Sequence, residues 1–226
     1  MSKHLQRDLE DLHRGILALA SAVEEAVNGA IRALQQRDVH LAQQVVVGDD
    51  AIDQQDNRIE EECLKILALH QPVAIDLRRI AAILKINTDL ERMGDLATDI
   101  AERAQRLAEL PPIPVPAALQ RMSDLTTAMV RKSLEAFVGP DPHQAREVCR
   151  LDDEVDQAND EIIQELIETM QRSAQSTEAA LSLFSATRHL ERIADHATNI
   201  AEDVIYLVEG EIVRHRPEAL SGDMSG

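Results

Sequence analysis

Leu90-Glu91-Arg92-Met93-Gly94-Asp95-Leu96-Ala97-Thr98-Asp99-Ile100-Ala101-Glu102 returns one hundred positions later as Leu190-Glu191-Arg192-Ile193-Ala194-Asp195-His196-Ala197-Thr198-Asn199-Ile200-Ala201-Glu202. Most of the thirteen pairs are identical, so the chain is an internal duplication. The repeat keeps its apolar positions, and it also keeps glutamate, arginine, aspartate and threonine positions that packing alone does not demand. We therefore look for function among these polar residues.

Composition favours an all-α protein. The 226 residues include two Phe, one Tyr and no Trp, and helix-forming residues dominate, with little strand signal. A net charge of −18 argues against nucleic-acid binding, which needs clustered basic residues. No apolar run approaches the roughly 20 residues of a membrane span, and residues 1–20 are charged from the third position on, so no secretory signal is expected. We expect a cytoplasmic protein.

Apolar residues recur at alternating steps of three and four, which predicts six long amphipathic helices joined by short turns. Short turns between long helices are typical of antiparallel bundles. Together with the duplication, this predicts two pseudo-symmetric antiparallel three-helix bundles. Prolines at 111, 112, 114 and 116 predict an extended linker between them. The expected divisions are a first repeat at 1–110, a linker at 111–116, a second repeat at 117–213 and a disordered tail at 214–226.

Acidic residues of the third helix share one face. At 100° per residue they fall within a sector of about 80°, nearly opposite the core positions. The second helix of each repeat carries its own acidic pattern, since Asp49-Asp50-x-x-Asp53 matches Asp152-Asp153-x-x-Asp156. The acidic residues of the third helix are Glu91, Asp95, Asp99 and Glu102.

Carboxylates four residues apart on a helix stand about 5–6 Å from each other, which is unfavourable unless a cation or an arginine intervenes. Two such pairs on neighbouring helices would offer several hard oxygen ligands, the type that Mg²⁺, Ca²⁺, Mn²⁺ and iron prefer. We therefore predict one polynuclear metal site per lobe. The predicted ligands are Asp49, Asp53, Glu91 and Asp95 in the first, and Asp152, Asp156, Glu191 and Asp195 in the second.

Other interpretations of the acidic residues stay open. The acidic faces could be solvated charge, with Arg92 or Arg192 pairing with neighbouring carboxylates. A ferritin-like di-metal enzyme would need paired Glu-x-x-His motifs that project inward, but Glu10-x-x-His13 occurs once. His189 and His196 flank the second motif and could bind metal, although solvent-exposed histidines are the simpler expectation. Nothing resembles a nucleophile with its base, a phosphate loop or a zinc signature, so no catalytic residue is assigned.

Several of these motifs together resemble the PhoU family of phosphate-specific transport system accessory proteins. The resemblance covers residues 9–208 in order, and the duplicated motif is its most specific part. The segments that carry it are Asp49-Asp50-x-Ile52-Asp53, Leu69-His70-Gln71-Pro72-Val73-Ala74-x-Asp76-Leu77-Arg78, Lys85-Ile86-Asn87-Thr88-Asp89-Leu90-Glu91-Arg92-Met93-Gly94-Asp95, Ile100-Ala101-Glu102-Arg103, and the second copy of the duplicated motif.

The resemblance implies a fold, metal sites and partners. PhoU-like proteins form two three-helix bundles and bind multinuclear clusters of iron or other divalent metals at E/D-x-x-x-D pairs, which fall on the eight residues named above. Iron, manganese, zinc and magnesium are the candidate metals. This chain departs from its own symmetry where Asp99 matches Asn199 and Asp89 matches His189. Asp99, Asn199 and Asp203 are therefore secondary candidate ligands.

The resemblance also implies a regulatory protein without enzymatic activity. PhoU-like proteins are negative regulators of the phosphate-starvation response. They are thought to link the PstSCAB phosphate transporter to the sensor kinase PhoR of the PhoR-PhoB pair, and a homodimer is expected. The alternatives are a carboxylate-bridged metalloenzyme and a purely structural helical interaction protein.

Overall fold

A computed structural model of the chain describes residues 3–210 and 213. Within these residues the chain forms six long helices and one short 3₁₀ turn, and no strand, so the predicted all-α fold is confirmed. The elements in order are α1 (Lys3–Gln36), α2 (Val39–His70), α3 (Ala74–Glu109), α4 (Ala118–Val138), α5 (Pro142–Arg172), η1 (Ala174–Ser176) and α6 (Thr177–Glu209).

Local signals explain where the helices begin and end. Asp38 caps α2, because its side chain accepts a hydrogen bond from the backbone N–H of Leu41 at 3.0 Å. Asp141 caps α5 in the same way, with Pro142 at the first helical position. Gly210 takes a left-handed conformation (φ 79°) after α6 and donates to the carbonyl of Tyr206. The proline-rich segment 111–116 has no helix.

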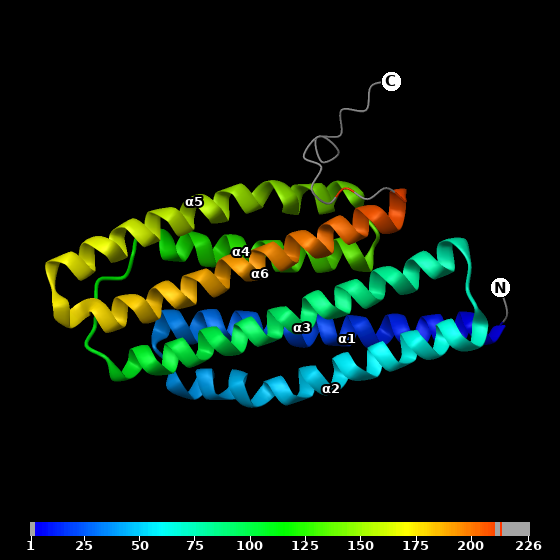
Figure 1. The fold of residues 1–226 in the computed structure, drawn as a ribbon, viewed down its shortest axis with the longest axis horizontal. Coiled ribbons are helices and arrows are strands. Elements are labelled where there is room, and N and C mark those ends of the chain that lie inside the picture. The colour runs from blue at the N-terminus through cyan, green and yellow to red at the C-terminus, as the bar shows by residue number, and fades with distance from the viewer. Residues whose placement is uncertain (1–2, 211–212, 214–226) are drawn as a thin grey trace, which may run out of the picture.

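The six helices form two antiparallel three-helix bundles, as predicted. In Figure 1, α1, α2 and α3 make up the lower bundle and α4, α5 and α6 the upper one. Helices α3 and α6, which carry the duplicated motif, pack against each other along the middle of the molecule. The buried apolar side chains of both bundles form one continuous core. The bundles are therefore joined by packing as well as by the linker.

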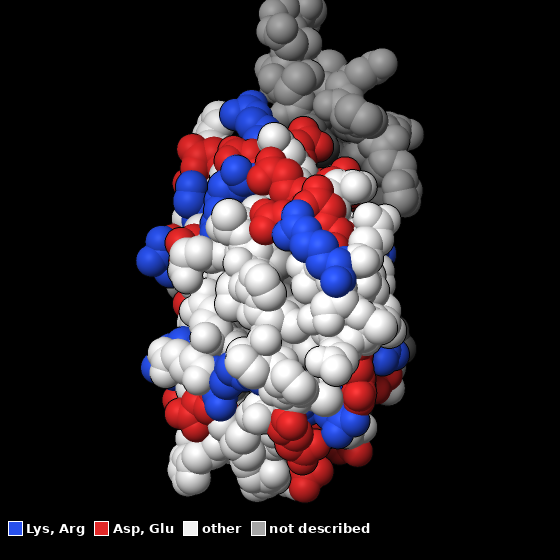
Figure 2. Space-filling model, turned by 90° about the vertical axis from the view of Figure 1, so that its left-hand side faces the viewer, with Lys and Arg blue, Asp and Glu red and all other residues white. Residues whose placement is uncertain are grey.

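The two ends of the long axis differ in their turns. One end carries the α2–α3 turn, close to the start of α1, and the other carries the α5–α6 turn and segment 111–116 (Figure 1). Figure 2 views this second end and shows uncharged residues across its middle, with acidic and basic groups gathered above and below. None of the described helices is long and apolar enough to cross a membrane. The tail expected at 214–226 lies outside the described residues.

Candidate metal centre

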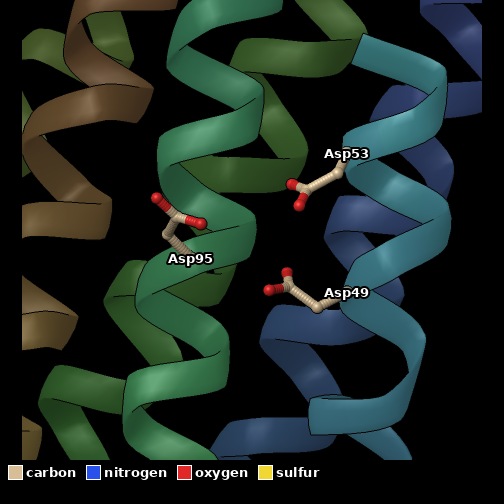
Figure 3. Close-up of side chains that lie close together, drawn as sticks. All are labelled: Asp49, Asp53 and Asp95. Atoms are coloured by element: carbon tan, nitrogen blue, oxygen red, sulfur yellow. The ribbon is translucent and has the colours of Figure 1, made fainter. Parts of the chain in front are cut away.

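In the first lobe, α2 and α3 bring three carboxylates together. Asp49 and Asp53 stand one turn apart on α2 and project toward Asp95 on α3 (Figure 3). One carboxylate oxygen from each of the three lies within 4.8 Å of the other two. Asp53 is exposed, whereas Asp49 and Asp95 are half-buried. Three hard oxygen ligands thus converge on one point at the surface of the bundle.

Glu91 and Arg92 border this trio on α3. Glu91 is half-buried, and the Arg92 guanidinium lies 3.3 Å from its Oε2 and 3.2 Å from Oδ2 of Asp95. Arg92 thus neutralises part of the charge, as the solvated-charge interpretation expects. Asp49 and Asp53 have no ion-pair partner among the described residues. One arginine therefore faces four carboxylates, and negative charge remains in excess.

The electrostatics of the first lobe disfavour the fully ionised state. Burial, followed by repulsion from Asp53, raises the pKa of Asp49, while the hydroxyl of Thr98 acts in the opposite direction. Burial and repulsion from Asp95 likewise raise the pKa of Glu91. Oδ1 of Asp49 is buried and has no hydrogen-bond partner. A cation at this point would relieve the repulsion and satisfy the buried oxygen.

Gly94 allows α2 and α3 to come close at this site. A Cβ atom at position 94 would lie 3.1 Å from Cγ2 of Ile52 and 3.7 Å from Oδ1 of Asp49. The first of these distances is tighter than ordinary packing, so an alanine here would push α2 outward unless Ile52 moved. The equivalent position in the second lobe is Ala194. The two lobes therefore differ in how closely their acidic helices can approach.

The second lobe repeats the acidic arrangement with looser geometry. Within the described part of the chain, Asp49, Asp53 and Asp95 are the one set of three acidic residues whose carboxylate oxygens all lie within 4.8 Å of one another. The second set still shows electrostatic crowding, because burial and then repulsion from Asp195 raise the pKa of Asp152 to about 6. Desolvation is the leading cause of the raised pKa values of Asp156, Glu191 and Asp195 as well.

One carboxylate of the second lobe has an arginine partner that the sequence did not indicate. Arg188 donates to Oε1 of Glu191 at 2.9 Å, whereas the solvated-charge alternative had named Arg192 as a possible partner in this lobe. Oε2 of Glu191 is buried without a hydrogen-bond partner. The second lobe thus also has a buried carboxylate oxygen that a cation could satisfy.

The two histidines are not solvent-exposed, and this expectation was wrong. Their side chains are each 18% exposed and lie between α3 and α6. His196 Nδ1 lies 2.8 Å from Oδ1 of Asp89, and His189 Nδ1 lies 3.7 Å from Oδ2 of Asp99. Asn199 donates to the same Asp89 oxygen at 3.2 Å. Periodicity missed this arrangement because it indicates the apolar core face of a helix, not a second buried face that is polar.

These contacts explain where the duplication loses its symmetry. Position 89 meets position 199 across the contact between the bundles, and position 99 meets position 189. If the two copies had stayed identical, two aspartates would face each other in each contact. Asn199 replaces that repulsion with a hydrogen bond. His189 replaces it with a ring that carries no negative charge, and burial lowers the pKa of this ring. We therefore assign Asp99 and Asn199 to the contact between the lobes.

Asp203 belongs to the same contact. It is 3% exposed, and its Oδ1 accepts a hydrogen bond of 2.7 Å from Nζ of Lys85 on α3. A carboxylate so deeply buried needs such a partner. This ion pair explains why Asp203 lies in the contact between the lobes.

Three further site residues were not predicted from the sequence. Thr98 and Thr198 stand beside Asp49 and Asp152, and their hydroxyls lower the pKa values of these carboxyls. Both copies of the duplicated motif have threonine at this position, and this identity could have identified Thr98 and Thr198 as site residues. Asn87 donates to Oδ1 of Asp56 at 2.5 Å and has Thr187 as its counterpart, so the duplication carried no signal there.

The donor sets fit hard divalent or trivalent cations. The candidate ligands are carboxylates, and those without an arginine repel one another, so cation binding is electrostatically favoured. Cysteine does not contribute to this chemistry. Cys63 is buried within the first bundle, and burial raises the pKa values of the Cys63 and Cys149 thiols to about 12, which keeps them protonated.

Comparison with known proteins gives the same result for both halves of the chain. The family model described as "PhoU domain" matches residues 16–104 and again residues 119–204. A phosphate-specific transport system accessory protein PhoU homolog from Pseudomonas putida is 42% identical over 216 residues, covering 95% of this chain and 84% of the relative. The homolog of the same name from Aquifex aeolicus is 42% identical over 212 residues, covering 94% and 96%.

Solved structures agree with the fold. The crystal structure of PhoU from Pseudomonas aeruginosa superimposes with a TM-score of 0.89 at 41% identity, covering 91% of this chain and 99% of that one. The phosphate transport system regulatory protein PhoU from Streptococcus pneumoniae gives a TM-score of 0.84 at 31% identity, covering 92% and 99%. The similarity thus extends over both bundles and their relative placement.

Proposed function

This chain belongs to the PhoU family, and from that premise we propose that it is an accessory protein that restrains phosphate uptake and the phosphate-starvation response when phosphate is plentiful. The observation that carries the proposal is the match of the whole two-bundle chain to relatives named for the phosphate-specific transport system. The name of the Streptococcus pneumoniae structure, a regulatory protein of phosphate transport, supports the regulatory part.

The protein would act as an adaptor between a PstSCAB-type phosphate transporter and a PhoR-type sensor kinase, as a homodimer in the cytoplasm. Long rigid helices around a continuous core suit an adaptor, because they hold binding surfaces at fixed separations. The net charge of −18 favours basic partner surfaces, since complementary charge accelerates association and suppresses wrong partners.

The acidic clusters would hold the metal. Asp49, Asp53, Glu91 and Asp95 are the proposed ligands of the first lobe, and the group with Asp152, Asp156, Glu191 and Asp195 is the counterpart in the second. A bound cation would supply positive charge that ties α2 to α3 and α5 to α6, and would offer a coordination position to a partner's side chain or to phosphate. The eight acidic residues supply the carboxylates, and the Thr98 and Thr198 hydroxyls support them. Gly94 allows α2 and α3 to come close in the first lobe.

The sharpest test combines metal content with signalling. A quadruple variant should lose its metal in elemental analysis and should leave a phosphate-regulated reporter constitutively expressed in cells. A control variant that removes the same number of charges elsewhere should keep both properties. The test variant is Glu91→Gln, Asp95→Asn, Glu191→Gln and Asp195→Asn, and the control is Glu24→Gln, Glu25→Gln, Glu61→Gln and Asp124→Asn.

The outcomes separate the alternatives. Unchanged metal content together with unchanged reporter regulation in the quadruple variant would contradict a role for the clusters and favour the purely structural interpretation. Loss of metal with normal regulation would mean that the protein acts as an adaptor and that this function does not depend on the metal. A turnover reaction that depends on the bound metal would instead favour the metalloenzyme.

A further inference from the structure

Exposed apolar side chains gather at the α2–α3 turn, which the candidate metal centre does not use. The described residues include twelve large hydrophobic residues that are exposed, and five of them lie within residues 64–77. The residue at the centre of the turn, Val73, is the most exposed of the twelve, at 74%. Exposed patches of this kind usually mark an interaction site. The five residues are Leu64, Leu69, Val73, Ile75 and Leu77.

The turn is held in shape by its neighbours. His70, the last residue of α2, pairs with Asp8 of α1 at 2.8 Å. On the other side, the Arg78 guanidinium lies over the Tyr206 ring of α6, 5.7 Å from its centroid. Between these anchors, Gln71 and Ala74 adopt positive φ values of 45° and 50°. Non-glycine residues in this region are strained and tend to occur at functional sites. The apolar side chains are thus presented by a fixed scaffold.

The charge of the turn differs from that of the whole chain. Residues 64–79 contain three basic residues and one acidic residue, although the chain carries a net charge of −18. Lys65 pairs with Glu62, so Arg78 and Arg79 carry the positive charge of the turn. Arg79 is exposed and has no ion-pair partner among the residues that the structure describes. Arg78 and Arg79 lie one turn of α3 behind the apolar residues at its start. The turn thus has an apolar tip with positive charge directly behind it.

The second lobe has no equivalent of this turn. Its connection between α5 and α6 is the short polar segment Ser173-Ala174-Gln175-Ser176. It lies at the opposite end of the long axis (Figure 1), where acidic and basic groups lie above and below the uncharged surface (Figure 2). The duplication has therefore kept an apolar, basic turn at one end of the molecule and a polar turn at the other.

We propose that the α2–α3 turn inserts into the surface of an anionic lipid bilayer. The apolar side chains would enter the interface between headgroups and acyl chains, and the exposed Arg79 would lie at the level of the anionic headgroups. The strongly acidic remainder would be repelled by the same surface, so the long axis would stand away from the bilayer. This inference goes beyond the proposed adaptor function, because it names a lipid contact that the adaptor role does not require.

Geometry favours lipid over a groove on another protein. The side chains of Leu69, Val73 and Ile75 come from the end of one helix, a turn and the start of the next helix, so they sit around a convex tip. Fluid acyl chains can surround such a tip, whereas a helix-binding groove receives one helical face with anchors at steps of three and four. The basic residues behind the tip match an anionic surface.

A single tryptophan tests the proposal, because the chain contains none. In Val73→Trp, mixed phosphatidylglycerol and phosphatidylcholine vesicles should shift the emission to the blue, and brominated lipids should quench it. The matched control is Val47→Trp, since Val47 is 66% exposed on α2, away from the turn. Its emission should not change. Vesicles of phosphatidylcholine alone should bind Val73→Trp more weakly.

Removing the apolar tip gives a second readout on the full chain. Leu69→Asp with Leu77→Asp should lower the vesicle partition coefficient measured by flotation roughly tenfold, about 1.4 kcal/mol, while helicity stays unchanged because both side chains are exposed. Val47→Asp should leave binding intact. The proposal is overturned if Val73→Trp shows no blue shift, or if Val47→Trp shifts equally. It is also overturned if Val73→Trp responds only to a reconstituted transporter and not to vesicles.

Discussion

Asp152 shows most clearly what crowded carboxylates do to a single residue. Its pKa is raised from 3.8 to about 6, first by burial and then by repulsion from Asp195 and Asp156. The folded state therefore holds a proton in a pH range where the unfolded state has already released it. The ionised carboxylate is tolerated in the fold only at a cost, and a cation that binds it recovers that cost.

From this we predict the pH dependence of stability after removal of metal by chelation. A raised folded-state pKa means that stability is fully present below about pH 4 and declines as the pH rises toward 6. Thermal unfolding between pH 4 and 7 should therefore show a falling Tm, and Asp152→Asn should flatten that fall. Adding Mn²⁺ to the metal-free wild-type protein at pH 7 should raise its Tm again, because a ligand that binds only the folded state stabilises that state. A Tm that rises over this range in both proteins would contradict the assignment.

Asn199 is the residue at which the duplication changed to let two bundles meet. It donates to Asp89, which is 9% exposed and also faces His196. Asn199→Asp would remove this donor and place a second carboxylate against the first. We expect a loss of about 2 kcal/mol of unfolding free energy in urea.

A double-mutant cycle distinguishes repulsion from simple loss of packing. In the Asn199→Asp background, Asp89→Asn should recover most of the lost free energy, because an amide and a carboxylate face each other again in reversed order. If the double variant is as unstable as the sum of the two single variants, the two positions do not interact, and the explanation of the asymmetry is wrong.

At the scale of elements, much of the fold was predictable from periodicity. The steps of three and four between apolar residues, Asp38 as a cap and the prolines between 111 and 116 located the helices, since each of these signals is local. The contact between α3 and α6 was not predictable. It buries Asp89 and Asp203, which pair with His196 and with the exposed Lys85. Buried polar residues of this kind look like solvent-facing residues in a sequence.

The residues of the candidate sites were predictable from the sequence, but the difference in geometry between the two lobes was not. Carboxylates at a spacing of four, repeated on paired helices, pointed to both clusters. The difference between the lobes depends on Gly94 and Ala194, which affect how closely two helices can approach. The sequence shows that Gly94 corresponds to Ala194, but it does not show that Ile52 packs against Gly94.

Gly94 therefore offers a test of helix spacing. In Gly94→Ala, the new Cβ would meet Ile52 Cγ2 at 3.1 Å, so α2 should move away and separate Asp49 from Asp95. We expect metal affinity of the first site, measured by calorimetric titration, to fall roughly tenfold, or about 1.4 kcal/mol.

Gly48→Ala is the matched control, because nothing lies within 4 Å of its added Cβ and the residue is inside α2. It should leave metal affinity unchanged and raise stability by about 0.5–1 kcal/mol, the usual gain of alanine over glycine within a helix. Equal effects of the two variants on affinity would mean that helix flexibility, and not helix spacing, governs the site.

At the scale of the whole molecule, the packing of α3 on α6 makes two repeats into one folding unit. The buried side chains form a single continuous core that includes residues of both bundles. Neither bundle can unfold without exposing the face it presents to the other. A signal at the metal site of one lobe could thus reach the other lobe through a rigid contact.

We therefore predict one cooperative unfolding transition for the metal-free chain, despite its two repeats. Calorimetry should give a single peak whose van't Hoff and calorimetric enthalpies agree, as they do for a two-state unit. Asn199→Asp, which weakens the contact between α3 and α6, should broaden or split that peak without reducing helicity at low temperature. Two resolved peaks in the wild type would mean that the bundles unfold independently. Each metal site would then stabilise only its own lobe, and transmission between the lobes would need a partner that spans both.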